Sequence, residues 1–325
     1  MNLWNRSVKF FSGQESPTAQ ALIRICAGAL VMLLFLQPLL EGVVPAIWMN
    51  IKDGGIFPLT KPPYLVRWLG GGSAITVYGL IGAGILSGLA IMLGIWHRLF
   101  AFIALQSVIA VTALNPYTPN GGDSLLTNML WLLIFSNASQ TLSLQAKLKT
   151  KSWHSATPIS SWPRYLMIIQ LCVLYLSAGF QKLSMHWLPF GDGQALWYIF
   201  NMPAYARFDL QFLAWISPIL QLASYFSWAF ENICPWLLLI CLRAENLDQK
   251  DGIGRLSRFL LRIHFRKLFI AMGFALHIGV FLTMNVGLFS WLTLMYYPAL
   301  FPKDWLTAIN DWISKKNPAI DNKVC

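Results

Sequence analysis

The sequence predicts an all-α fold: a polytopic integral membrane bundle of about eight transmembrane helices, with the N- and C-termini in the cytoplasm. Composition is the first observation, because 56% of the 325 residues are hydrophobic and only 11% are charged, whereas about a quarter of a soluble domain is charged. The second is that several almost uncharged runs approach the ~20 residues that cross a hydrocarbon core of ~30 Å. We therefore interpret residues 1–325 as a single transmembrane domain.

The apolar runs give eight expected spans. They lie at about 21–40, 74–94, 98–114, 124–140, 164–183, 211–242, 267–284 and 286–302. Charge supports this count, since about three quarters of the 24 Lys and Arg residues fall in segments that it places inside, as the positive-inside rule requires. No signal-peptide pattern precedes the first span, so we expect that span to be retained.

Two segments are irregular and one is strongly amphipathic. Residues 211–242 are long for one crossing and contain two prolines, which is consistent with a tilted helix or with a helix preceded by a re-entrant piece. Residues 44–68 are half apolar, and we expect them along the outer interface. Residues 243–266 combine arginines at helical spacing with apolar positions, which predicts a basic amphipathic helix on the anionic inner leaflet.

Several function classes are excluded or disfavoured. The net charge of +11 comes from short loops between apolar runs, which favours membrane lipids as partners and no nucleic acid. The five cysteines form no disulfide framework. No metal-ligand spacing, nucleophile elbow or phosphate-binding loop is found, so we expect no metal site and no motif names a reaction.

The stretch "SAGFQKLSMHW" holds the first candidate site, at the expected outer end of the fifth span. Lys182 is either a charge that snorkels to the headgroups or a desolvated amine able to act as a base. His186 with Asp192 is either an acid–base pair or a surface pair, and Trp187 is a candidate contact for a cofactor.

The turn "NPYTPNGGDS" is the second candidate site. Asp123 either caps the next helix or contacts a ligand, and Asn120 beside it is a candidate cofactor contact.

Ionisable residues inside the spans form the third group, since such residues are costly in lipid and serve function or structure. Glu231 and His277 are expected at similar depths, so a contact between them is stereochemically possible, with Arg24 as a competing partner for Glu231. Such a contact would be either a structural tie between helices or part of a proton relay or ligand site.

Four segments of the chain together resemble the horizontally transferred transmembrane (HTTM) family, which includes the vitamin K-dependent gamma-carboxylase. They are "ALIRICAGALVMLLFL" with "IKDGGIFPL", "NPYTPNGGDSLLTNMLWLLIF", "YLSAGFQKLSMHW" with "GDGQALWYIF", and "ALHIGVFLTMNVGLFSWLTLMYYPALFPKDW". The resemblance implies a reduced quinone, similar to vitamin K, as cofactor. It also implies that Lys182, in the segment like the carboxylase's "AGFQKL", is the base that starts the chemistry.

The resemblance differs in one functional loop. The carboxylase carries a functional histidine where this chain has Gly122 and Asp123, so glutamate carboxylation itself is not implied. The length and the "NGGD" loop are similar to the small bacterial SdpB-type members, which mature a secreted peptide toxin together with a soluble partner.

Three functions therefore remain open. The first is an enzyme of the bacterial inner membrane that modifies a small secreted peptide at the extracytoplasmic face. The second is a non-catalytic membrane partner in peptide maturation or export, and the third is a small-molecule transporter.

Overall fold

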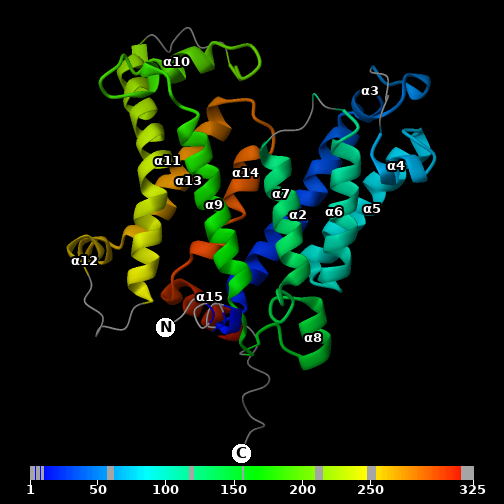
Figure 1. Cartoon of the computed structure of the whole chain (residues 1–325). Helices are drawn as coiled ribbons and strands as arrows, with labels where there is room; N and C mark the ends of the chain where they lie inside the picture. Colours follow the sequence, from blue (N-terminus) through cyan, green and yellow to red (C-terminus); the bar gives the residue numbers. More distant parts are fainter. Residues whose placement is uncertain are drawn as a thin grey trace, which may run out of the picture. The chain divides into compact units, whose positions relative to one another are not determined.

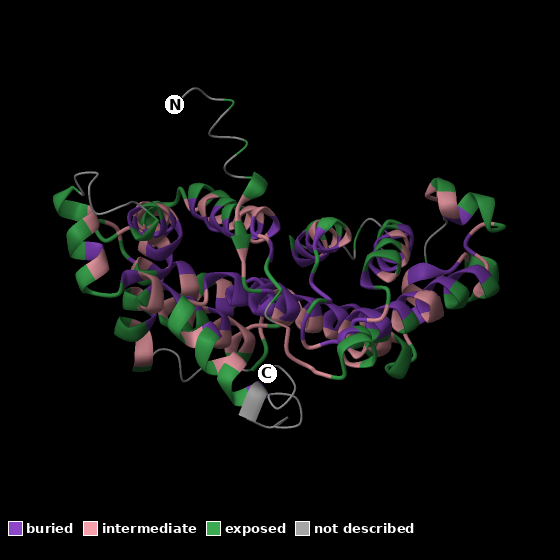
Figure 2. Ribbon diagram, turned by 90° about the horizontal axis from the view of Figure 1, so that it is seen from below, coloured by how far each residue is buried: buried purple, intermediate pink, exposed green. Residues whose placement is uncertain are grey.

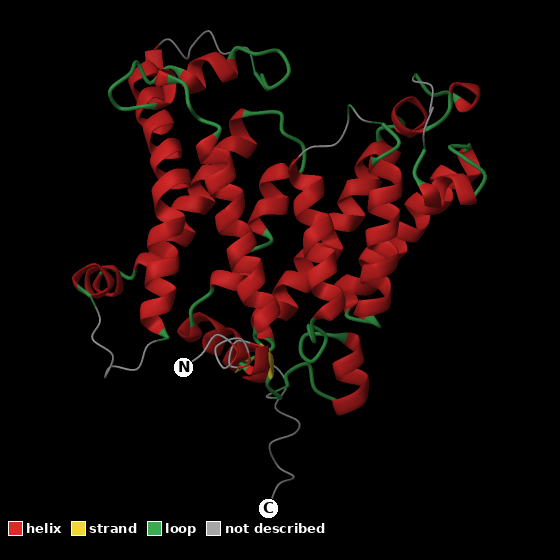
Figure 3. Cartoon of the chain, in the orientation of Figure 1, coloured by secondary structure: helices red, strands yellow, loops and turns green. Residues whose placement is uncertain are grey.

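The computed structural model is almost entirely helical (Figure 3). It describes residues 4, 8, 11–56, 62–115, 117, 121–155, 157–208, 215–246 and 254–315. The chain divides into two compact units, the first formed by residues Met1–Met167 and Trp291–Cys325 and the second by Ile168–Ser290.

Unit 1 contains most of the elements (Figure 1). In chain order they are β1 (Gln14–Glu15), α2 (Thr18–Leu40), α3 (Val44–Trp48), η1 (Ile51–Asp53), α4 (Tyr64–Trp68), α5 (Ala74–Leu93), α6 (His97–Thr112), α7 (Gly121–Phe135), α8 (Leu144–Thr150), β2 (Ile159–Ser160), the first turns of α9 (Trp162–Phe180), most of α14 (Phe289–Leu294), η4 (Tyr297–Leu300) and α15 (Lys303–Lys315). Strands β1 and β2 pair antiparallel, with Gln14 opposite Ser160.

Unit 2 contains the rest of α9 and the elements that follow it. These are η2 (Met185–Trp187), α10 (Ala195–Phe200), α11 (Ser217–Glu245), α12 (Arg255–Arg262) and α13 (Phe265–Thr283). Within this unit, α10 lies at one end of α11 and α12 lies at the other (Figure 1).

The expected spans correspond to observed helices at seven of eight places. Five described helices, α2, α5, α9, α11 and α13, are long and apolar enough to cross a membrane. The apolar helices α6 and α7 have 16 and 15 residues, about 24 Å and 23 Å at 1.5 Å per residue, somewhat short of the ~30 Å hydrocarbon core. The sequence-based prediction of an all-α membrane protein is thus confirmed.

The eighth expected span, 286–302, is not one long helix. Its described residues form the six-residue α14 and the four-residue η4, and Pro298 in η4 cannot donate a main-chain hydrogen bond. Residues 292–300 are all buried, which is the condition under which broken helical backbone is tolerated at membrane depth. Apolarity alone does not distinguish such a protein-covered segment from a lipid-facing span.

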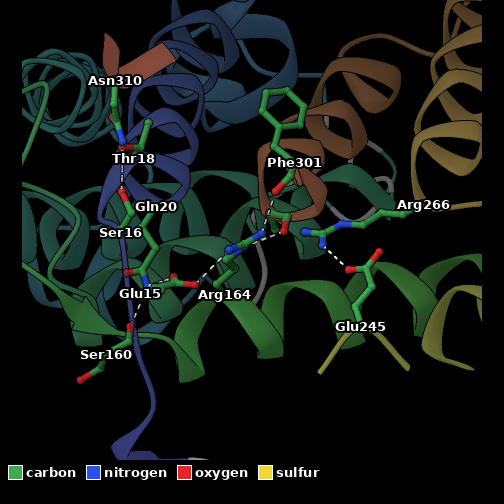
Figure 4. Close-up of polar contacts among 11 residues, drawn as sticks. Glu15, Ser16, Thr18, Gln20, Ser160, Arg164, Glu245, Arg266, Phe301 and Asn310 are labelled. Carbon is green, nitrogen blue, oxygen red and sulfur yellow. Dashed lines mark hydrogen bonds and ion pairs between the residues drawn. The ribbon is translucent and has the colours of Figure 1, made fainter. Parts of the chain in front are cut away.

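Arg164 donates hydrogen bonds to carbonyls at the end of this broken segment, and Glu15 pairs with Arg164. The Arg164 guanidinium donates to the carbonyls of Ala299 and Phe301 at 2.7 Å and 2.9 Å, and it pairs with the Glu15 carboxylate at 3.0 Å (Figure 4). Carbonyls at a helix end have no helical partner of their own. This arginine therefore supplies donors that the apolar sequence around it lacks.

The long helices of unit 1 pack closely because small residues face each other. A Cβ added to Gly28 of α2 would lie 2.5 Å from the Gly88 carbonyl oxygen of α5, and one added to Gly88 would lie 2.7 Å from the Gly28 oxygen. Small residues at a crossing allow two backbones to approach, which is the usual way that membrane helices associate. Buried residues accordingly line the packed sides of the helices (Figure 2).

Arg24 of α2 is fully buried and is bound entirely by main-chain carbonyls. Its guanidinium donates to Ile91 and Met92 at the end of α5, at 2.5 Å and 2.7 Å. It also donates to Ala138 at 3.2 Å and to Leu142 at 2.6 Å, in the loop after α7. A cation at a helix C-terminus is favoured by the helix dipole, so Arg24 joins α2, α5 and this loop.

The long segment 211–242 and the amphipathic segment 243–266 can now be assigned where the structure describes them. From Ser217 onward α11 is a single 29-residue helix with Pro235 inside it, while residues 209–214 lie outside the described part of the chain. The basic amphipathic helix is α12, in the second half of the expected range, with Leu260 buried. Arg266 binds Glu245 at 2.6 Å and so ties α13 to the end of α11 (Figure 4).

We predict that Arg24→Met lowers the free energy of unfolding by at least about 2 kcal/mol, the scale of leaving one or two buried carbonyls without a donor. Thermal unfolding of the purified protein in detergent measures the change. Lys52→Met is the control, because it removes a cation from an exposed position. Equal unfolding midpoints for the two variants would contradict a structural role for Arg24.

Candidate functional site

Lys182 follows the end of α9 and turns back to an acid on α11. Its main-chain N–H donates to the Gly179 carbonyl at 3.0 Å, and its Nζ forms an ion pair with the Glu231 carboxylate. The two side chains are only 16% and 9% exposed. Lys182 is therefore a partly buried, paired amine, and the snorkelling alternative does not describe it.

Close packing of α9 on α11 makes this pair possible. A Cβ added to Gly179 would lie 2.7 Å from the amide nitrogen of Asn232, the residue after Glu231. Only glycine leaves room for the two helices to meet at this level. The end of α9 thus brings Lys182 within reach of the middle of α11.

Residues 184–200, which we call the cap segment, pack against α11 and place one aromatic ring beside the pair. The Leu196 N–H donates to the Ser224 hydroxyl of α11 at 3.3 Å. Gly193 has a positive φ of 66°, and a Cβ there would lie 2.6 Å from the Tyr225 hydroxyl. From the cap segment Trp187 places its ring 4.9 Å from the Lys182 Nζ, a cation–π distance.

The partly buried position changes the relative free energies of the charged and neutral forms of the Lys182–Glu231 pair. Separated charges are costly in a low-dielectric site, whereas a neutral amine beside a neutral carboxylic acid avoids that cost. The charged and neutral forms of the Lys182–Glu231 pair therefore compete more closely than they would in water. Transfer of the Lys182 proton to Glu231 within the ion pair would convert the charged form into the neutral one.

His186 forms the pair with Asp192 that the sequence suggested, and it does so at the surface. Nδ1 of His186 lies 2.7 Å and 2.8 Å from the two carboxylate oxygens, and the side chains are 44% and 48% exposed. The hydrogen bond from His186, followed by one from the Gln194 N–H, lowers the pKa of Asp192. Asp192 therefore remains ionised at neutral pH and orients the imidazole, which also contacts the Tyr198 ring.

His277 lies elsewhere in unit 2, against an aromatic cluster. Its Nε2 is 2.8 Å from the Tyr175 hydroxyl. The Tyr175 ring packs edge-on against Phe230 and Phe269, with centroids 5.0 Å and 6.0 Å away. Because Phe230 precedes Glu231, the cluster adjoins the ion pair along α11.

The sequence suggested a contact between Glu231 and His277, but the structure gives each a different partner. Glu231 binds Lys182 and His277 binds Tyr175. Arg24, the competing partner for Glu231, is instead bound by four carbonyls. Depth counted along an expected span located both ionisable groups correctly inside helices, but it could not indicate that Lys182 bends back toward Glu231.

The turn "NPYTPNGGDS", the second candidate site, belongs to unit 1. Asp123 lies in the first turn of α7, where a carboxylate is favoured by the helix dipole. Asn120 lies outside the described residues. Among the residues that the structure does describe, no three His, Cys, Asp or Glu side chains are grouped to hold a metal ion.

We predict that Lys182 and Glu231 are energetically coupled. Lys182→Met or Glu231→Gln alone should destabilise the protein by about 2–3 kcal/mol, below the ~3–5 kcal/mol of a fully buried pair because the side chains are 16% and 9% exposed. The double variant should lose less than the sum of the two single losses, since neither charge is then unpaired. Additive losses in detergent unfolding measurements would mean that the pair makes no net contribution.

Comparison with known proteins gives one match. A family model described as the HTTM domain matches residues 14–244, which cover α2 through nearly all of α11, including Lys182 and Glu231. No match was found among curated proteins or among solved structures. Because the matched region is more than two thirds of the chain, this integral membrane protein belongs to the HTTM family.

Proposed function

We propose that this protein is a membrane-embedded enzyme that modifies a small secreted peptide at the extracytoplasmic face, with Lys182 as its base. The observation that carries the proposal is the Lys182–Glu231 ion pair beneath Trp187. Opposite charges held at a partly desolvated position are a frequent arrangement for acid–base chemistry. The charge bias of the loops supports the extracytoplasmic side, because the end of α11 that carries α12 is the basic one.

The pair provides a base by an internal proton transfer. Movement of the proton from the Lys182 ammonium to the Glu231 carboxylate leaves a neutral amine beside a carboxylic acid. The amine then accepts a proton from an acidic O–H group of a bound molecule and becomes an ammonium again. Loss of the Glu231 proton to water restores the starting pair.

A reduced quinone is the cofactor that this donor set fits. The Lys182 amine would accept a proton from a quinol hydroxyl, and the Trp187 ring offers an aromatic face beside that amine. When bound, such a cofactor would supply two reducing equivalents, and its oxidation by dioxygen would provide the strong base needed to deprotonate a peptide side chain. His186, oriented by Asp192, stands in the same cap segment as a second acid–base group. His277, Asp123 and Asn120 remain predicted contacts.

The surface of the cap segment supports a second candidate function, a non-catalytic partner in peptide maturation. Phe190 of the cap segment is 74% exposed, and Leu183, directly before the segment, is 81% exposed, so this end of unit 2 offers apolar side chains to a peptide or to a soluble maturation partner. In that case the cap segment would bind, and the ion pair would only hold α9 against α11.

Lys182→Arg separates these two functions. Arginine keeps the positive charge and the ion pair with Glu231, but it does not give up its proton in proteins. We predict that a strain carrying Lys182→Arg expresses the protein at the normal level, yet secretes the peptide without its modification. Mass spectrometry of the peptides secreted by the wild type, the deletion strain and the variant measures this.

Lys52→Arg is the matched control, because it makes the same substitution at an exposed lysine of unit 1. It should leave the secreted products unchanged. If Lys182→Arg also gives wild-type products, while changes at Leu183 and Phe190 abolish co-purification of a secreted partner, the catalytic proposal is wrong and the binding function stands.

A further inference from the structure

A cavity of about 400 Å³ lies in unit 1, far along the chain from Lys182. Three segments line it: the α5–α6 turn together with the first turn of α6, the loop that follows α7, and α8. These segments lie at the end of unit 1 that carries α8 and α15, opposite the end that carries α3 and α4 (Figure 1). By the charge distribution of the sequence this is the cytoplasmic end.

The lining of the cavity is cationic and contains no carboxylate. Arg98 and Lys149 are its charged residues, and no Asp or Glu is among the described residues around it. Two Arg98 donors are used, by the Ser136 carbonyl at 3.0 Å and by the Asn137 amide oxygen at 2.5 Å. Among the described residues, neither Lys149 nor the second terminal nitrogen of Arg98 has a hydrogen-bond or ion-pair partner, so both are available to a ligand.

Two neutral side chains, those of Gln140 and Ser139, add hydrogen-bond donors to the cavity lining. Gln140 lines the same cavity, and its amide can donate two hydrogen bonds. The Ser139 hydroxyl is buried and has no hydrogen-bond partner in the described part of the chain. A buried hydroxyl without a partner is rare in a folded protein, and a ligand in the cavity would give the Ser139 hydroxyl one.

The cavity is held in shape by the buried arginine of α2. Arg24 binds the carbonyls of Met92, Ala138 and Leu142, which flank the α5–α6 turn and the loop after α7. Gly94 in this turn has a φ of 71°, and a Cβ there would lie 2.3 Å from Ser143. The walls are therefore fixed by the fold before a ligand arrives.

Trp96 indicates the depth of the cavity in the bilayer. It lines the cavity and is 66% exposed at the junction of two apolar helices. Tryptophan collects at the level of the lipid headgroups, where its ring is partly apolar and its N–H can meet water. The cavity is thus open at the depth where lipid phosphates lie.

We propose that this cavity binds a phosphate-ester anion, with Arg98 and Lys149 as the charged contacts and Gln140 and Ser139 as hydrogen-bond donors. An arginine fork matches the paired oxygens of a phosphate, and basic pockets at the cytoplasmic ends of membrane helices suit anionic headgroups. The same chemistry is found in the headgroup of an anionic phospholipid and in a soluble phosphate ester.

Native mass spectrometry of the full-length protein in an uncharged detergent tests the lipid source. We expect phosphatidylglycerol to bind more tightly than phosphatidylcholine, which carries a compensating positive charge. Lys149→Gln should weaken phosphatidylglycerol binding by about 5-fold and Arg98→Gln/Lys149→Gln by about 25-fold, taking ~1 kcal/mol for each cation near the membrane surface. Calorimetric titration with glycerol 3-phosphate tests the soluble source with the same variants.

Lys147→Gln/Lys151→Gln is the matched control. It removes two positive charges beside the same helix without touching the cavity lining, since neither lysine lines the cavity, and it should change binding by less than about 2-fold. Lys149→Gln removes no hydrogen bond or ion pair among the residues that the structure describes, so its effect can be measured without replacing Arg98.

Four outcomes decide the proposal. Selective loss of phosphatidylglycerol binding in the cavity variants supports a lipid site, and the same loss seen only with glycerol 3-phosphate supports a site for a soluble ester. Equal weakening by the cavity pair and the control pair would show a general surface-charge effect and overturn the proposal. Wild-type protein that binds neither probe overturns it as well.

Discussion

A charge placed among apolar helices must be paired by the protein itself, and this requirement shapes both units. In unit 1 the buried cation of Arg24 is bound by four carbonyls that belong to α5 and to the loop after α7. In unit 2 the carboxylate of Glu231 is bound by Lys182. The cost of an unpaired charge in such surroundings is several kcal/mol, so these contacts fix which segments lie together.

The two solutions have different chemical consequences. Arg24 cannot lose its proton under any ordinary condition, so it is suited to a permanent structural role. Lys182 is an amine, which in its neutral form is a base, so the pair that holds the end of α9 against α11 is also the pair on which the proposed chemistry rests. The cap segment lies against both the Lys182 side chain and α11, because Trp187 stands beside the amine and the turn at Gly193 fits closely against α11.

Much of the fold could be predicted from the sequence, since length and apolarity of a run are sufficient to identify a long membrane helix. The broken segment 289–300 could not, because it is as apolar as a lipid-facing span and differs only in being covered by protein. Helix α12 followed from the spacing of arginines and apolar residues. The expected contact between Glu231 and His277 was replaced by two other pairings, and the resemblance of "AGFQKL" to a family segment indicated Lys182 but not its partner. A pair of this kind depends on the close packing at Gly179 and on the path of the chain after α9. The spacing of apolar residues in the sequence predicts neither of these.

Infrared difference spectroscopy of the proton in the Lys182–Glu231 pair tests the central claim most directly. If the pair can adopt its neutral form at neutral pH, the wild-type spectrum contains the carbonyl band of a protonated carboxylic acid that disappears in Glu231→Gln. The same band should be absent in Lys182→Arg, because arginine keeps its proton and holds Glu231 ionised. A wild-type spectrum indistinguishable from that of Lys182→Arg would show a permanently charged pair and would contradict the assignment of Lys182 as a base.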